Sequence, residues 1–206
     1  MMLSHPESFW QNVSAEEKWR DYILPRNSKE ELDAEGRMEA SRLFYFFDSA
    51  STVIDYGCGI GRVLQYVAER AGRVVGIDIS QNYLNRAREF VKSDNVTFYQ
   101  PGQYQQENVA DFIYCFMVLQ HNDETHRAEI MRHIYSLLKI GGTAIIGLPR
   151  HESNYYKEGV FIHKFKKEEV ALWGAMFRSY RITEGNYPGY EKEYAGDNEY
   201  FLIGVK

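Results

Sequence analysis

The chain has 206 residues, 44% of them hydrophobic, and a formal net charge of −5, which suits one globular domain with its own core. The acidic balance disfavours nucleic acid and anionic membranes as partners, because both attract clustered Lys and Arg. No run approaches the roughly 18 consecutive apolar residues of a membrane-spanning helix, and the start lacks the pattern of a secretory signal. We therefore expect a cytoplasmic protein without membrane contact, with Cys58 and Cys115 both reduced.

The first fifty residues have a helix-favouring composition and precede any strand pattern. Two stretches, 15–22 and 29–47, are rich in helix formers, and the second ends in an aromatic cluster around Phe44 and Phe47. We interpret residues 1–50 as an N-terminal helical cap and residues 51–206 as one compact domain. The cap, including Trp10, is either a lid that excludes water from a bound ligand or a helical segment that simply packs on the sheet.

From residue 52 onward, short apolar runs alternate with segments of helical period, which is the pattern of β-α units and a parallel sheet. Four runs are predicted strands: 52–56, 73–77, 95–99 and 143–148. Between the last two of these, the run 112–119 is continuously apolar, as expected of a central strand buried on both faces together with its exit. Ser80 is placed to cap the second helix, and Gly141-Gly142 is predicted to end the third.

The end of the chain departs from this alternation. Residues 150–162 are polar and aromatic, and we interpret them as an irregular insertion loop. A helix is predicted over 166–177, followed by two strands, 180–187 and 199–205, with no helix between them. Strands joined in this way pair antiparallel, so the sheet is expected to finish with an antiparallel strand.

A glycine-rich turn joins the first strand to the first helix, with the sequence Asp55-Tyr56-Gly57-Cys58-Gly59-Ile60-Gly61-Arg62. Glycines let the backbone turn sharply and approach a ligand, and N–H groups at a helix start favour an anionic group. In open α/β sheets, ligands bind at this place. Arg62 stands where the dinucleotide fingerprint has its third glycine, which favours a ligand without a pyrophosphate.

Asp78 comes directly after the second predicted strand. A carboxylate at a strand end can accept hydrogen bonds from both vicinal hydroxyls of a ribose. Ile79, next to it, can pack on a purine ring. The alternative is that Asp78 only caps the following helix, which is a common role for Asp at such a junction.

Four segments in this order, VIDYGCGIGR, VVGIDIS, DFIYCFMVLQH and LLKIGGTAIIGLP, resemble the class I S-adenosylmethionine-dependent methyltransferases. The resemblance covers residues 52–148. It implies an α/β, Rossmann-like, doubly wound seven-stranded sheet whose last strand is antiparallel, in agreement with the end of the chain. It also implies S-adenosylmethionine as the cofactor and transfer of a methyl group to O or N of a small-molecule acceptor.

The resemblance further implies which residues bind the cofactor. Gly57, Gly59 and Gly61 would border its methionine part, with Asp55 near the amino group and Arg62 at the carboxylate. Asp78 and Ile79 would hold the adenosine, Gln103 would take the place of an acidic residue near the adenine, and Met117 would lie beyond the fourth strand beside the methyl group.

Methyl transfer requires an acceptor aligned with the methyl group and, where the acceptor loses a proton, a base to take it. His121, which lies just after the fourth strand, is the first candidate for this base. The alternative is that it only shapes the cofactor pocket. Weaker candidates for the acceptor pocket border or lie within the insertion: Arg150, His151, Tyr155, Tyr156 and His163. No spacing of His, Cys or carboxylates matches a metal site, so none is expected.

Two other hypotheses fit the same residues. A regulator or partner subunit of this fold would bind the cofactor without methylating anything. An NAD-dependent oxidoreductase would also use a carboxylate such as Asp78 to bind a ribose, but it requires the G-x-G-x-x-G spacing of the dinucleotide fingerprint. The stretch 115–119 lacks the Asn/Asp-Pro-Pro-aromatic motif of adenine methylases, which again disfavours nucleic acid. The sequence specifies neither the acceptor nor an oligomeric state.

Overall fold

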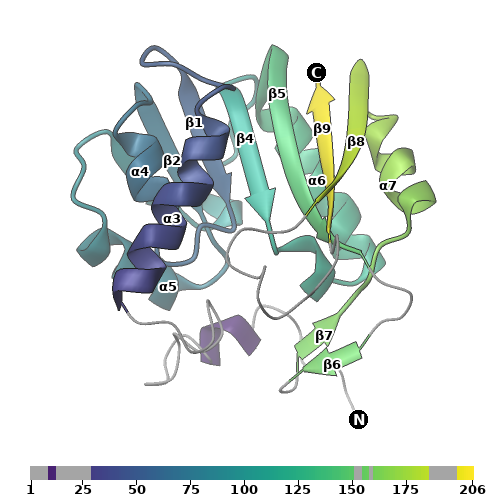
Figure 1. Ribbon diagram of the computed structural model, residues 1–206, viewed down its shortest axis with the longest axis horizontal. Coiled ribbons are helices and arrows are strands. Elements are labelled where there is room, and N and C mark those ends of the chain that lie inside the picture. Colours follow the sequence, from purple (N-terminus) through teal and green to yellow (C-terminus); the bar gives the residue numbers. More distant parts are fainter. Residues whose placement is uncertain (1–8, 13–28, 151–154, 158–159, 186–198) are drawn as a thin grey trace. The chain divides into compact units, whose positions relative to one another are not determined.

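Residues 9–12, 29–150, 155–157, 160–185 and 199–206 are described by the computed structural model of the chain (Figure 1). The chain divides into two compact units, Met1–Gln105 and Gln106–Lys206. Each unit has its own pairing strands and its own buried apolar residues.

The first unit holds three parallel strands in the order β3-β2-β1: β1 (Thr52–Tyr56), β2 (Arg73–Ile77) and β3 (Val96–Tyr99). Val53 and Val75 have no exposed surface, as expected of parallel strands covered on both faces. Tyr56 pairs with Ile77 at the ends of β1 and β2. The glycine-rich turn and Asp78, which come directly after these two ends, therefore start from neighbouring positions at the carboxyl edge of the strands.

The helices of the first unit are α3 (Lys29–Leu43), α4 (Leu64–Ala68) and α5 (Gln81–Phe90), with a 3-10 turn, η1 (Pro101–Gln103). Ser80 caps α5 as predicted, because its hydroxyl accepts the N–H of Tyr83 at 3.2 Å. In Figure 1, α3 is the helix next to α4, and the two pack against each other. Leu32 and Leu43 of α3 are buried, so this helix contributes to the core of the unit.

The second unit holds four strands in the order β4-β5-β9-β8: β4 (Ala110–Phe116), β5 (Leu138–Pro149), β8 (Ser179–Gly185) and β9 (Glu199–Val205). β4 and β5 are parallel, whereas β9 is antiparallel to both β5 and β8. Its helices are α6 (Glu124–Leu137) and α7 (Lys167–Gly174), with a 3-10 turn, η2 (Leu119–His121). With seven strands and an antiparallel last strand, the fold is the α/β, Rossmann-like one that was predicted.

The apolar run 112–119 divides after Phe116 into β4 and its exit, because Met117 has a left-handed backbone, with φ of 57°, and η2 comes next. Two sequence predictions differ from the structure. Gly141-Gly142 lies within β5 and does not end a helix, since α6 already ends at Leu137. The segment 150–162 is not wholly irregular, since β6 (Tyr155–Lys157) and β7 (Val160–Ile162) form a two-stranded antiparallel sheet.

The predicted cap is described in part. Residues 9–12 are helical, and α3 covers most of the stretch predicted over 29–47. The helix predicted over 15–22 lies outside the described residues, and the boundary at residue 50 stays a prediction. Within the described part of the chain, no helix combines the length and the apolar character needed to cross a membrane.

Candidate functional site

The glycine-rich turn after β1 is built on left-handed backbone. Gly57, Gly59 and Gly61 have φ values of 89°, 52° and 79°, which residues with a Cβ rarely adopt. A Cβ on Gly61 would also lie 2.6 Å from Cγ2 of Val91, so no larger residue fits there without a shift. The three glycines are therefore required by the path of the backbone between β1 and α4.

Most of the N–H groups between Gly57 and Gly61 donate within the protein. The N–H groups of Gly57 and Cys58 both donate to the carbonyl of Ile77, at 2.6 and 3.0 Å, and that of Gly61 donates to the carbonyl of Cys58 at 2.8 Å. The N–H of Gly59 donates to Oδ2 of Asp78 at 2.8 Å. These bonds tie the turn to the end of β2.

Asp78 joins the turn to the start of α5. Its Oδ2 accepts the N–H of Gly59, and its Oδ1 accepts the N–H of Ser80 at 2.8 Å. Burial raises the pKa of Asp78 to about 6, although both backbone hydrogen bonds act to lower it. Ser80, and not Asp78, is the N-cap residue of α5, so the carboxylate is not placed there as a helix cap.

A ribose diol fits this carboxylate. An ionised carboxylate offers about four acceptor positions, and the backbone N–H groups of Gly59 and Ser80 occupy two of them. Two positions are left for two vicinal hydroxyls, and the side chain is only half-buried. Hydroxyl donors would also stabilise the charged form, which burial alone disfavours.

Ile79 and Gln103, the predicted adenine contacts, lie near the same strand ends. The Ile79 carbonyl accepts the side-chain amides of Gln11 at 3.1 Å and Gln100 at 2.9 Å. Gln103 is exposed, and its Oε1 accepts the N–H of Gln100 at 3.1 Å. Gln100, the first residue after β3, is thus the glutamine that reaches Ile79, and Gln11 shows that residues 9–12 also lie at this place.

Asp55 and Cys58 are buried at the base of the turn. Burial is the main cause that raises the pKa of Cys58 well above its usual value, and the nearby carboxylates of Asp78 and Asp55 add to it. The thiol therefore stays protonated and unreactive. Both cysteines of the chain are buried and free, in agreement with the expected reduced thiols.

Arg62, the predicted carboxylate contact, makes a buried ion pair with α3. Its Nη2 lies 2.8 Å from Oε1 of Glu39, and the two side chains are 9% and 1% exposed. Glu39 was not singled out in the sequence, where it is one charged residue among many in a helix. A partner 23 positions away leaves no local signal.

In the second unit, Met117 and His121 lie just beyond the end of β4. Met117 has the left-handed backbone described above, a conformation that costs a residue with a Cβ roughly 1–2 kcal/mol. Nδ1 of His121 lies 3.4 Å from the Phe161 carbonyl, and its Nε2 lies 3.2 Å from the Gln120 side-chain nitrogen. Burial lowers the pKa of His121 to about 4, so the ring is neutral at pH 7.

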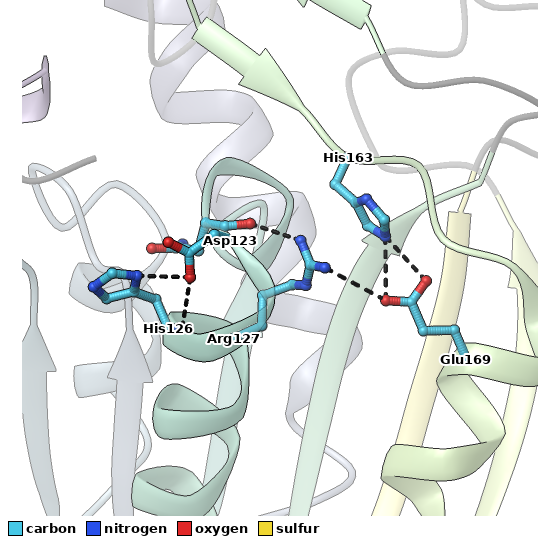
Figure 2. A network of polar contacts seen from close by, with 6 residues as sticks. Asp123, His126, Arg127, His163 and Glu169 are labelled. Carbon is cyan, nitrogen blue, oxygen red and sulfur yellow. Dashed lines mark hydrogen bonds and ion pairs between the residues drawn. The ribbon is translucent and has the colours of Figure 1, made fainter. Parts of the chain in front are cut away.

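The polar network in Figure 2 brings a second histidine to the same end of these strands. The His163 N–H donates to the Gln120 carbonyl, next to His121, at 2.8 Å, and the Phe165 N–H donates to the Pro149 carbonyl at 3.0 Å. His163 thus lies between the segments that come after β4 and β5. Ligands of open α/β sheets bind at the carboxyl ends of parallel strands, so His163 is a candidate site residue.

His163 is paired with a carboxylate, Glu169 of α7. Its Nε2 lies 3.1 and 3.0 Å from the two Glu169 oxygens (Figure 2). A carboxylate on Nε2 favours the tautomer with a proton there and leaves the lone pair on Nδ1. Nδ1 has no hydrogen-bond partner among the residues that the structure describes. The pair therefore presents a proton acceptor with a carboxylate behind it.

The rest of the network fixes α6. Asp123 is the N-cap of α6 and accepts the N–H and Nδ1 of His126 at 2.9 and 2.8 Å. Arg127 donates to the Asn122 carbonyl at 2.6 Å, and its other terminal nitrogen lies 3.9 Å from Glu169 (Figure 2). Arg127 thus links the start of α6 to the carboxylate that holds His163.

For the other residues predicted to border the acceptor pocket, the structure gives fewer contacts. Arg150 pairs with Glu184 of β8 at 2.6 Å. Tyr155 and Tyr156 lie in β6, and His151 lies outside the described residues. No group of three or more His, Cys, Asp or Glu side chains within the described ranges could hold a metal ion.

Comparison with known proteins agrees with this geometry. Residues 53–142 match a family model described as a methyltransferase domain. The chain is 34% identical over 100 residues to N-demethylindolmycin N-methyltransferase of Streptomyces griseus, a match covering 46% of this chain and 42% of that protein. It is 30% identical over 138 residues to trans-aconitate 2-methyltransferase of Azoarcus sp. (strain BH72), covering 65% and 51%. The chain spans about half the length of these curated relatives.

Among solved structures, the chain is similar to Burkholderia thailandensis 1,6-didemethyltoxoflavin-N1-methyltransferase with bound 1,6-didemethyltoxoflavin and S-adenosylhomocysteine. The TM-score is 0.69 at 16% identity, and the match covers 100% of this chain and 92% of that chain. This likeness supports a Rossmann-like α/β fold. In this chain, the fold carries a glycine-rich turn after β1 and the Asp78 carboxylate at the end of β2. Residues 53–142 are thus similar to a methyltransferase domain, in agreement with the motifs quoted from the sequence.

Proposed function

We propose that the chain transfers a methyl group from S-adenosylmethionine to an oxygen or nitrogen of a small-molecule acceptor. The match of residues 53–142 to a methyltransferase domain supports the cofactor and the reaction. The acceptor class is supported by the names of its relatives, which include N-demethylindolmycin N-methyltransferase and trans-aconitate 2-methyltransferase. The formal charge of −5 is a further argument against a nucleic-acid acceptor.

The observation that carries the proposal is the Asp78 carboxylate, held by the Gly59 and Ser80 N–H groups with two acceptor positions left for a ribose diol. In this proposal Asp78 binds both ribose hydroxyls and Ile79 packs on the adenine. Gly57, Gly59 and Gly61 let the backbone approach the methionine part, and Asp55 lies at its amino group. When bound, S-adenosylmethionine supplies a methyl group on a positively charged sulfur.

We assign the proton that the acceptor loses to His163. Its Nδ1 takes that proton, and Glu169 on Nε2 stabilises the resulting imidazolium. His121 is less suited to this role, because burial lowers its pKa to about 4 and both ring nitrogens have neighbours at hydrogen-bond distance. His121 then shapes the segment after β4, which is the alternative considered for it from the sequence.

Calorimetric titration with S-adenosylmethionine, S-adenosylhomocysteine and NAD tests the cofactor. The two sulfur compounds should bind with micromolar Kd, NAD should not, and Asp78→Asn should weaken binding by at least about tenfold, or about 1.4 kcal/mol. Asp94→Asn is the matched control, because Asp94 is an exposed aspartate in the turn before β3. Binding of NAD in preference to both sulfur compounds would overturn the proposal.

Turnover is tested next, by measuring S-adenosylhomocysteine released in the presence of small amines, carboxylic acids and heteroaromatic compounds. Release that depends on one of these compounds supports an enzyme. Tight cofactor binding with no release for any of them would favour the regulator or partner subunit over the methyltransferase.

A further inference from the structure

The helix α3 is in direct backbone contact with the glycine-rich turn. Gly36 of α3 is buried, and a Cβ added to it would lie 2.4 Å from the Arg62 carbonyl oxygen and 3.0 Å from the Arg62 Cγ. A glycine inside a helix costs about 1 kcal/mol relative to alanine. That cost is offset here because only glycine lets α3 come this close to the residue after Gly61.

The same residue, Arg62, is tied to α3 by its side chain. The Glu39–Arg62 ion pair is 2.8 Å long and almost fully buried. Removing one partner of such a pair leaves an uncompensated buried charge and typically costs about 3–5 kcal/mol. One turn of chain further on, the Tyr66 hydroxyl donates to Asp33 of α3, and Arg37 of α3 lies over the Tyr66 ring at 4.6 Å. Backbone and side-chain contacts thus hold the turn and α4 on α3.

The turn transmits this placement to Asp78. Gly61 donates to Cys58, and Gly59, between them, donates to Oδ2 of Asp78 at 2.8 Å. If the turn moves away from α3, the Gly59 N–H moves with it, and the Asp78 carboxylate loses one of the two N–H groups that orient it. α3 is connected to the ribose end of the site as well as to the methionine end.

We infer that Arg62 is a positioning residue of the cofactor site, which fixes the glycine-rich turn on α3 through Glu39, and not the ligand of the cofactor's carboxylate. This inference rests on the proposed function, since it concerns the same cofactor. It replaces the contact that the family resemblance implied for Arg62, and it makes α3 a structural part of the site.

Glu39→Gln separates the two roles of Arg62. If Arg62 positions the turn, this variant binds S-adenosylhomocysteine about tenfold more weakly. Its affinity for 5′-methylthioadenosine, which lacks the amino-acid part, then falls by a similar factor. If Arg62 binds the cofactor's carboxylate, releasing it from Glu39 leaves S-adenosylhomocysteine binding unchanged or stronger. Calorimetry with both compounds measures the ratio of the two losses. The control is Glu30→Gln, which removes one carboxylate from an exposed position of the same helix.

A second variant covers the case in which Glu39→Gln does not fold. Glu39→Gln/Arg62→Gln removes both buried charges and leaves two amides that can hydrogen-bond, so folding is retained. If Arg62 positions the turn, this variant binds both compounds more weakly, by equal and partial factors. If Arg62 instead binds the cofactor's carboxylate, only the affinity for S-adenosylhomocysteine falls. Hydrogen exchange of the Gly59 N–H without ligand is an independent readout, and positioning predicts faster exchange in both variants.

The outcomes distinguish this inference from the proposed function. If the unchanged chain binds neither compound, the proposed function fails and the inference fails with it. Normal binding by the unchanged chain together with undiminished binding by Glu39→Gln overturns the inference alone. The inference alone is also overturned if the double variant binds S-adenosylhomocysteine more weakly but keeps its affinity for 5′-methylthioadenosine.

Discussion

Burial moves the pKa of two candidate site residues toward the neutral form. The pKa of Asp78 is raised to about 6 and that of His121 is lowered to about 4. A raised carboxyl pKa contributes stability at low pH that is lost as pH rises from about 4 to 6. A lowered histidine pKa does the opposite, since the unfolded chain binds the proton more tightly and stability rises between about pH 4 and 6.5. The two effects oppose each other in one pH range, so only variants separate them.

Cofactor binding is expected to depend on the ionisation of Asp78. Ribose hydroxyls bond to the ionised carboxylate, so the Kd for S-adenosylhomocysteine should rise by about tenfold between pH 7 and pH 5, as Asp78 takes up a proton near pH 6. Calorimetry across this range measures the effect. Asp78→Asn should bind weakly but without this pH dependence, and Asp94→Asn should retain it. A wild-type affinity that is flat from pH 7 to 5 would contradict the role given to Asp78.

His121 is expected to control stability on the acid side of neutrality. Relative to His121→Gln, the wild-type chain should gain about 2 kcal/mol in free energy of unfolding as the pH rises from 5 to 7, because desolvation of its ring disfavours protonation in the folded chain. Urea unfolding of both proteins at several pH values gives the difference. A difference that does not change with pH would mean that the ring is protonated as easily in the folded chain as in the unfolded one.

His163 and Glu169 are expected to act in turnover. With the acceptor that releases S-adenosylhomocysteine fastest, His163→Asn should lower kcat by about 10²–10⁴-fold and Glu169→Gln by less, while the Kd for S-adenosylhomocysteine stays unchanged. His126→Asn, on the neighbouring helix, is the control and should keep its kcat. If His121→Asn shows the large loss and His163→Asn does not, the base is His121.

Sequence reasoning singles out candidate residues that carry a local signal. Asp78 was found because it ends a strand beside a glycine-rich turn, and Ser80 because it starts a helix. Glu39 and Glu169 carry no such signal, since each is defined by a partner in another element, Arg62 and His163. Gln100 comes directly after a strand as Asp78 does, so the same rule could have singled it out in place of Gln103.

At the scale of elements, the strands were predicted better than the segments that connect them. β1, β2 and β9 have the predicted bounds, because each is a short apolar run between polar or glycine-rich residues. The last residue of β4 could not be placed within the run 112–119, because Val118 and Leu119 continue the apolar run and only the left-handed backbone at Met117 ends the strand. The β6-β7 sheet was missed since each strand has three residues, too few to show an alternating pattern.

The packing of Phe177, in the segment after α7, on β9 depends on a glycine. The Cβ of an alanine at Gly204 would lie 2.4 Å from the Phe177 ring, which is itself buried and contacts Tyr135. Gly204→Ala should therefore lower the free energy of unfolding by about 1–3 kcal/mol, as overpacking does. Gly185→Ala is the matched control in β8, since its Cβ would meet only Phe201 at 3.6 Å. Equal stability of the two variants in urea unfolding would show that the Phe177 ring moves freely.

At the scale of the whole molecule, the sequence resemblance covers only part of the candidate site. The quoted motifs span residues 52–148, which include the glycine-rich turn, Asp78 and β4. His163, Glu169 and α3 lie outside that range, in segments whose positions depend on contacts far apart in sequence. The candidate cofactor residues therefore lie in segments with recognisable motifs, whereas Glu169 and α3 do not.

Two truncations test whether the N-terminal segment is a lid or a structural part of the first unit. A fragment beginning at residue 49 loses Leu32 and Leu43 from the core, each worth roughly 1.5–3 kcal/mol, and leaves Arg62 without Glu39. It should lose the stabilisation by S-adenosylhomocysteine, which in the full chain is about 2.7 kcal/mol at 100 times Kd. A fragment beginning at residue 29 keeps α3 and loses only contacts such as that of Gln11 with Ile79, so it should keep most of this stabilisation. Thermal unfolding with and without the ligand compares the three proteins. If the shorter fragment unfolds at the same temperature as the full chain and responds equally to the ligand, α3 is no part of the cofactor site.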